Sequence, residues 1–187
     1  MEEIRKVKLL RGVLTVLFVV YLLALFRFTL FKYAPLSDLG SAFFLKERQV
    51  SLIPFKNAYT MIQNMSPVRL VENFAGNVLL FLPFGLMLPL ISGFDRESVA
   101  YGLILSLFIE VMQYAFAMGF SDIDDLILNT LGTFIGWALY LFISKRFKDY
   151  THFMIFMAIV LTIGAAVSFA VLYKAGILVD GFPNIVL

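Results

Sequence analysis

The stretch FAGNVLLFLPFGLMLPLI, residues 74–91, contains no charged side chain and decides the class of the protein. A helix needs about 20 mostly apolar residues to cross the hydrocarbon core of a bilayer. Four further stretches are mostly apolar over a similar length: residues 12–31, 99–118, 126–143 and 153–173. These runs are too long for the strands of an outer-membrane barrel, which alternate in hydrophobicity over roughly ten residues. We therefore predict an all-α fold, a polytopic transmembrane helical bundle with five spans.

The composition of the chain excludes several other classes of protein. Of the 187 residues, 61% are hydrophobic and 15% are charged, whereas soluble domains have about 45–50% and about 25%. A net charge of +2 offers no large basic surface, so we expect no nucleic-acid partner. With no cysteine and a single histidine, we predict no metal site and no cofactor. The expected partners are membrane lipids, and the sequence predicts no particular oligomeric state.

The distribution of lysine and arginine predicts how the spans are oriented. Basic residues occupy the N-terminal tail (Arg5, Lys6, Lys8, Arg11) and the turn after the fourth stretch (Lys145, Arg146, Lys148). The loop between the third and fourth stretches has only acids: Asp122, Asp124 and Asp125. Basic residues favour the cytoplasmic side, so we predict a cytoplasmic N-terminus and an external C-terminus. The long loop 32–73 is then external, with a helix start at Ser66-Pro67.

Polar residues within the first four spans are predicted to lie at one end of the bundle, because consecutive spans cross the membrane in opposite directions. A charged side chain at the centre of a bilayer costs about 2.5–3.5 kcal/mol, which marks such residues as functional candidates. Ser106, Glu110 and Gln113 share one helix face. We predict an outward-opening polar pocket between the first four spans, in which Arg27 pairs with Glu110. The candidate ligand-binding residues are Arg27, Asn73, Asn77, Glu110, Gln113, Asp122, Asp124, Asp125 and Asn129.

Three residues within the spans are predicted to shape helix packing. Pro83 removes a backbone hydrogen bond and is expected to kink its helix. Gly132 and Gly136 form a small-xxx-small pair, which lets two membrane helices approach closely.

The polar candidates also have purely structural interpretations. Arg27 can extend to the headgroups, and Asn77 and Gln113 can hydrogen-bond between helices. The three acids can cap the helix that follows them. The chain has no nucleophile elbow, zinc-protease motif or phosphate-binding loop, so we name no catalytic residue and favour a protein that is not an enzyme.

Four motifs in order resemble the VanZ-like family of bacterial membrane proteins. They are LIPF at 52–55, NFAGNVLLFLPFGLMLP at 73–89, EVMQ at 110–113 and DIDDLILNTLG at 122–132. The resemblance implies a VanZ-like membrane domain over residues 1–145, followed by an additional fifth span and a short external tail over 146–187. One departure is Phe120 after Gly119, where similar proteins often have an arginine.

The resemblance implies a multi-pass protein of the bacterial plasma membrane that lowers susceptibility to glycopeptide and lipoglycopeptide antibiotics of the teicoplanin type. A polar outward pocket suits an amphiphile, which can be a lipid, a lipid-linked wall component or the antibiotic itself. The alternative is a membrane enzyme that modifies a lipid-linked headgroup through Glu110 with Asp124 or Asp125. A transporter is disfavoured, because no polar residue lines the other half of the spans.

The absence of native cysteines makes the predicted orientation directly testable. In intact cells, a membrane-impermeant thiol reagent should label Asp122→Cys and should label Lys148→Cys only after permeabilisation, because the basic turn is expected in the cytoplasm. Labelling of Asp122→Cys from the cytoplasm alone would reverse the orientation.

Overall fold

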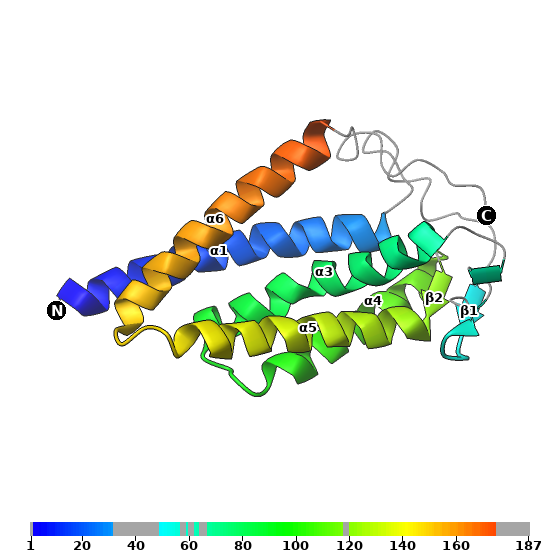
Figure 1. Ribbon diagram of the computed structural model, residues 1–187, viewed down its shortest axis with the longest axis horizontal. Helices are drawn as coiled ribbons and strands as arrows, with labels where there is room; N and C mark the ends of the chain where they lie inside the picture. Colours follow the sequence, from blue (N-terminus) through cyan, green and yellow to red (C-terminus); the bar gives the residue numbers. More distant parts are fainter. Residues whose placement is uncertain are drawn as a thin grey trace.

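The computed structural model describes residues 2–31, 49–56, 59, 62–63, 67–117 and 120–174. Consecutive long helices in it run in alternating directions (Figure 1). Five helices are long and apolar enough to cross a membrane, which confirms the predicted all-α bundle. They are α1 (Glu2–Leu30), α3 (Pro67–Ser92), α4 (Ser98–Phe116), α5 (Ile123–Ser144) and α6 (Tyr150–Lys174).

Two helices begin well before their apolar stretches. Helix α1 begins at Glu2, where the 2.9 Å ion pair between Glu2 and Lys6 joins successive turns of the basic segment. Helix α3 begins at Pro67, within the part of the chain that was assigned to the external loop 32–73. A proline needs no hydrogen-bond partner for its nitrogen in the first turn, which is why this position suits it.

A short pair of parallel strands adds a feature that the helical pattern does not predict. Strand β1 (Gln49–Ser51) pairs with β2 (Phe120–Asp122), with Val50 opposite Ser121. The pair joins the segment before α3 to the turn between α4 and α5 (Figure 1).

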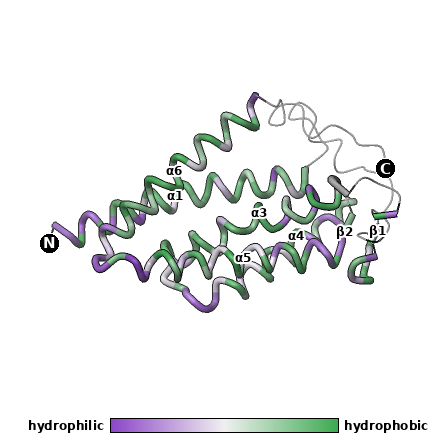
Figure 2. The backbone as a smooth tube through the Cα atoms, viewed as in Figure 1, coloured by the Kyte–Doolittle hydropathy of each residue, from purple (hydrophilic) through white to green (hydrophobic). Residues whose placement is uncertain are grey.

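The hydrophobic surface lies along the middle of the helices. Figure 2 shows hydrophobic residues over most of the helical length, with hydrophilic residues gathered towards the two ends of the bundle. Many large apolar side chains on the outer faces are exposed, for example Leu23 at 66% and Leu79 at 63%. This pattern is expected for helices surrounded by lipid, where the outer surface need not be polar.

Helices α3 and α5 pack with their backbones in contact. A Cβ added to Gly132 would overlap the carbonyl oxygen of Val78, and one added to Gly136 would overlap that of Leu82. On the facing helix, a Cβ on Gly85 would overlap the carbonyl oxygen of Thr133. The predicted packing residues Gly132 and Gly136 therefore take part in this contact together with Gly85, a third glycine that the small-xxx-small pattern did not include.

The proline in the middle of α3 lies inside the helix and does not end it. The turn that contains Pro83 is braced from α1, because the Tyr21 hydroxyl donates a 2.7 Å hydrogen bond to the carbonyl oxygen of Leu80. The donor that a proline at 83 removes is the one that would reach the carbonyl oxygen of Leu79, so the tyrosine bonds the neighbouring carbonyl group.

Substituting alanine for the glycines tests the close contact. Gly85→Ala and Gly136→Ala should each lower the free energy of unfolding by about 1–3 kcal/mol, because the added methyl group meets backbone atoms that cannot move aside. Chemical denaturation in detergent micelles measures this quantity. The control is Gly76→Ala in the same helix, where an added Cβ meets nothing within 4 Å. That variant should be neutral or slightly stabilising; equal losses at all three positions would contradict the packing argument.

Candidate functional site

The predicted polar residues gather at the end of the bundle where α1 and α4 end and where α3 and α5 begin (Figure 1). The β1–β2 pair lies at the same end (Figure 1). Arg27 is in the last turn of α1, and Glu110 and Gln113 lie near the end of α4. The acids stand at the beginning of α5, where carboxylates interact favourably with the positive end of the helix dipole.

Asp122 caps the N-terminus of α5. Its Oδ1 atom accepts a 3.0 Å hydrogen bond from the backbone N–H of Asp124, in the usual geometry of an N-cap aspartate. The capping interpretation of the acidic loop therefore holds for this residue.

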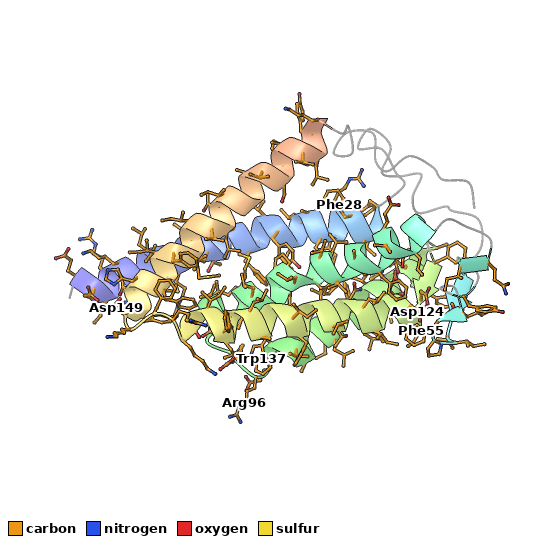
Figure 3. All side chains as sticks on the ribbon, in the orientation of Figure 1. Phe28, Phe55, Arg96, Asp124, Trp137 and Asp149 are labelled. Atoms are coloured by element: carbon orange, nitrogen blue, oxygen red, sulfur yellow. The ribbon has the colours of Figure 1, made fainter. Side chains whose placement is uncertain are left out.

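Asp124 and Asp125 are directed at different partners. Asp124 is 3% exposed, and its Oδ1 atom accepts a 2.7 Å hydrogen bond from the backbone N–H of Phe55 (Figure 3). Phe55 has a φ of 62°, a left-handed conformation that is unfavourable for a residue with a side chain. Asp125 Oδ1 accepts a 2.5 Å hydrogen bond from Asn77 Nδ2. The two acids thus connect α5 to the segment after β1 and to α3.

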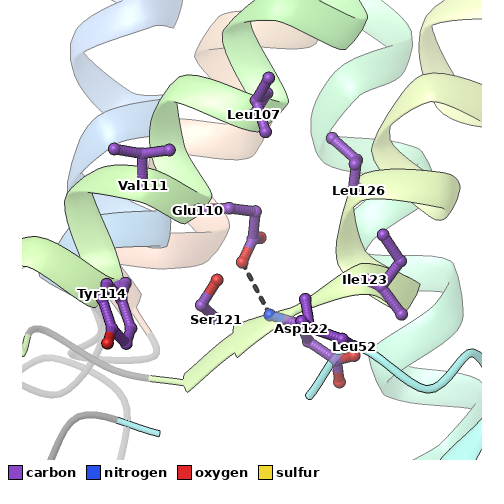
Figure 4. A pocket seen from close by; sticks show the side chains of 9 residues that line it. All are labelled: Leu52, Leu107, Glu110, Val111, Tyr114, Ser121, Asp122, Ile123 and Leu126. Atoms are coloured by element: carbon purple, nitrogen blue, oxygen red, sulfur yellow. Dashed lines mark hydrogen bonds between the residues drawn. The ribbon is translucent and has the colours of Figure 1, made fainter. Parts of the chain in front are cut away.

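Glu110 connects α4 to the turn before α5. The side chain is 6% exposed, and Oε2 accepts a 2.7 Å hydrogen bond from the backbone N–H of Asp122 (Figure 4). Ser121 lies beside the same carboxylate. A buried carboxylate is stable only with donors of this kind.

The predicted ion pair between Arg27 and Glu110 is wrong: the two side chains do not pair in the described part of the chain. Arg27 Nη1 instead donates to the carbonyl oxygen of Phe31, just beyond the end of its own helix. Unpaired carbonyl groups and the negative end of the dipole make a helix C-terminus attractive to a guanidinium. Glu110 needs no cation, because the N–H of Asp122 already satisfies it.

Two buried amides make hydrogen bonds between helices. Asn129 Nδ2 donates to Ser106 Oγ over 2.9 Å, and Gln113 Nε2 donates to the carbonyl oxygen of Thr29 over 3.2 Å. Their oxygens, Asn129 Oδ1 and Gln113 Oε1, have no donor among the described residues. Asn73 is half-buried, and its side chain makes no hydrogen bond with the described residues.

A pocket of ≈ 210 Å³ lies beside Glu110, between α4, α5 and the two strands (Figure 4). Leu107 and Val111 are about half exposed, at 50% and 55%, so the pocket opens on the outer surface of the bundle. The lining is mostly apolar and consists of Leu52, Leu107, Glu110, Val111, Tyr114, Ser121, Asp122, Ile123 and Leu126.

The position of this pocket differs from the one predicted between the first four spans. Only Glu110 and Asp122 of the nine candidates line it. Between α1, α3 and α4 the space is filled by a hydrophobic cluster that includes Leu25, Phe81 and Ile109. The other candidates are therefore not in its lining, and their role in binding stays a prediction.

Some lining residues were not among the sequence candidates. Leu52 belongs to the LIPF motif and Ser121 directly precedes the acidic block, but neither residue type signals a site by itself.

No group of three or more metal-ligating side chains is arranged to hold a metal ion within the described ranges.

Comparisons with known proteins match the part of the chain that builds this site. A family model described as VanZ/LLP1 matches residues 18–144. Protein VanZ of Enterococcus faecium is 34% identical over 124 residues, which cover 62% of this chain and 76% of that protein. No solved structure matches the chain. The family match includes β1, β2 and α3 to α5 and ends before α6.

Removing the Asp124 carboxylate should release the segment that follows β1. In Asp124→Ala the amide of Phe55 loses its acceptor. The hydrogen exchange of this amide should become roughly tenfold faster or more, because that factor corresponds to the free energy of one hydrogen bond to a charged group. Hydrogen exchange followed by mass spectrometry measures this on the full chain. Asp124→Asn keeps an acceptor oxygen and should exchange nearly as slowly as the native protein. Equal exchange in both variants would mean that the bond does not hold this segment.

Proposed function

This chain belongs to the VanZ/LLP1 family, and on that premise we propose that it binds an amphiphile at the external face of a bacterial plasma membrane. Through this binding it lowers susceptibility to glycopeptide and lipoglycopeptide antibiotics of the teicoplanin type. The ligand is a lipid, a lipid-linked wall component or the lipoglycopeptide itself.

The main support for the proposal is the pocket beside Glu110, which combines a buried carboxylate with an apolar opening on the outer surface of the bundle. Leu107, Val111 and Leu126 offer surface to an acyl chain. Burial of apolar area contributes about 25 cal/mol per Å². A ligand with one apolar and one polar part matches such a lining better than a wholly polar solute does.

The charges of the pocket restrict the headgroup. Its polar lining consists of the carboxylates of Glu110 and Asp122 and the hydroxyls of Ser121 and Tyr114, so hydrogen-bond acceptors predominate. Like charges repel at short range, which disfavours a phosphate in the pocket. The favoured headgroup carries hydroxyl, amide N–H or ammonium donors.

The alternative of a membrane enzyme is supported by the two carboxylates that line one pocket. Asp124 and Asp125 are already engaged by Phe55 and Asn77. Of the three acids only Asp122 lines the pocket, so Asp122 would be the partner of Glu110 in general acid–base catalysis.

The binding proposal is tested with the purified full chain in detergent, with teicoplanin as the probe and a glycopeptide without an acyl chain for comparison. Glu110→Gln keeps an acceptor for the Asp122 amide but loses the charge, and should bind teicoplanin roughly tenfold more weakly. Leu107→Trp fills the pocket and should abolish saturable binding. Isothermal titration calorimetry measures both.

Matched controls separate the pocket from general effects on the helices. Glu72→Gln removes an exposed carboxylate elsewhere, and Leu103→Trp enlarges an exposed side chain one turn before Leu107 and outside the lining; both should bind like the native protein. Equal binding in all four variants, or no binding by the native protein, would contradict the proposal. Mass spectrometry of the recovered ligand should find it unchanged, and an altered mass would favour the enzyme.

A further inference from the structure

Two basic segments that are far apart in the sequence lie at the end of the bundle opposite the pocket (Figures 1 and 2). One is the first part of α1, with Lys8 and Arg11, and the other is the turn between α5 and α6. A 3.2 Å hydrogen bond from Thr151 Oγ1 to Glu3 Oε2 joins the beginning of α6 to the beginning of α1.

Packing of apolar neighbours brings the two basic segments to one hydrophobic cluster. Leu10 lies between Lys8 and Arg11 in the sequence, and Phe147 lies between Arg146 and Lys148. Leu10 and Phe147 both pack against one hydrophobic cluster, which contains Phe153 and Met154 of α6. The fold therefore surrounds one apolar cluster with basic residues from both segments.

The acids of these two segments are already occupied. Glu2 pairs with Lys6 over 2.9 Å, and Glu3 accepts the bond from Thr151. Asp149 accepts a 2.9 Å hydrogen bond from the backbone N–H of His152, which lowers the pKa of its carboxyl group and keeps it ionised.

Six cations of the two segments are left over after these pairings. Arg5, Lys8, Arg11, Lys145, Arg146 and Lys148 are exposed, and none forms an ion pair with another described residue. The guanidinium of Arg146 lies 4.8 Å from the centroid of the Phe142 ring. Such a group has donors available for an anion at the level of the headgroups.

An apolar concavity of ≈ 290 Å³ lies further along α6, lined by Ala158, Ile159, Thr162 and Ile163. All four lining residues belong to α6, which diverges from α1 towards its C-terminal end (Figure 1). At about 1.5 Å per residue, Ala158 lies roughly 12 Å and Ile163 roughly 20 Å from the beginning of the helix. Half of the hydrocarbon core is about 15 Å thick, so an acyl chain with its headgroup at the basic end reaches this concavity.

We propose that the basic end binds an anionic phospholipid, with the phosphate between the α1 cations and the α5–α6 turn and an acyl chain in the concavity of α6. The site lies at the end opposite the Glu110 pocket and selects the opposite headgroup charge, so it does not depend on the proposed function. All of its named residues lie outside residues 18–144, the segment that matches the family. The bound lipid braces α6 against α1.

The test uses the full chain reconstituted into vesicles of phosphatidylcholine with an equal part of phosphatidylglycerol. After extraction into neutral detergent, native mass spectrometry counts the phosphatidylglycerol that each protein retains. The native protein should retain phosphatidylglycerol in preference to phosphatidylcholine. Lys8→Gln/Arg11→Gln and Lys145→Gln/Arg146→Gln/Lys148→Gln should lose it by roughly fivefold for each charge removed.

Two further variants keep the outcome decisive. Lys56→Gln/Lys174→Gln removes two cations elsewhere and should retain the lipid fully. Ile159→Trp fills the acyl concavity without changing any charge and should also lose the lipid, so a folding defect of the charge variants cannot explain both losses. Inorganic phosphate should not displace the lipid, since it lacks the acyl chain.

Several results would overturn the proposal. These are equal retention of the two lipids by the native protein, losses in the control as large as in the basic variants, full retention in Ile159→Trp, or displacement by phosphate alone. A loss of phosphatidylglycerol in the basic variants that leaves teicoplanin binding intact would support two separate sites.

Discussion

The contact between the backbones of α3 and α5 is the constraint on which the polar end of the protein depends. Gly132 and Gly136 can lie against the carbonyl groups of α3 only because they have no side chain. Lipid gives no hydrophobic drive for helices to associate, so close van der Waals packing has to supply it. The contact also sets how far one helix is shifted along the other, which puts Asn77 next to Asp125.

The acids at the beginning of α5 organise the polar end rather than stand exposed in it. Asp122 caps its helix, Asp124 holds Phe55, and Asp125 is bound by Asn77. Glu110 in turn receives the backbone N–H of Asp122. Each of the four carboxylates accepts a hydrogen bond from a neutral donor of its own, which favours its charged form. The pocket that results exposes acceptors and apolar surface together.

The two ends of the bundle therefore have different electrostatic characters. At one end, carboxylates line a pocket next to apolar surface, which suits a headgroup with donors. At the other end, lysines and arginines surround an apolar cluster, which suits a phosphate. Under the two proposals, a single small bundle offers each face of the membrane a different kind of headgroup site.

The sequence by itself determined the class of the fold, since an uncharged run such as residues 74–91 is stable in a membrane only as a helix. It also identified the residues that gather at one end, because alternate spans reverse direction. Tertiary structure alone decided their partners. The separation of 12 residues between Glu110 and Asp122 does not reveal that Glu110 accepts a hydrogen bond from a backbone N–H. From the sequence, the attraction between opposite charges instead predicted Arg27 as the partner of Glu110. Nor does periodicity reveal the β1–β2 pair or the position of the pocket, because both arise where segments distant in sequence meet and the space between α1, α3 and α4 is already filled.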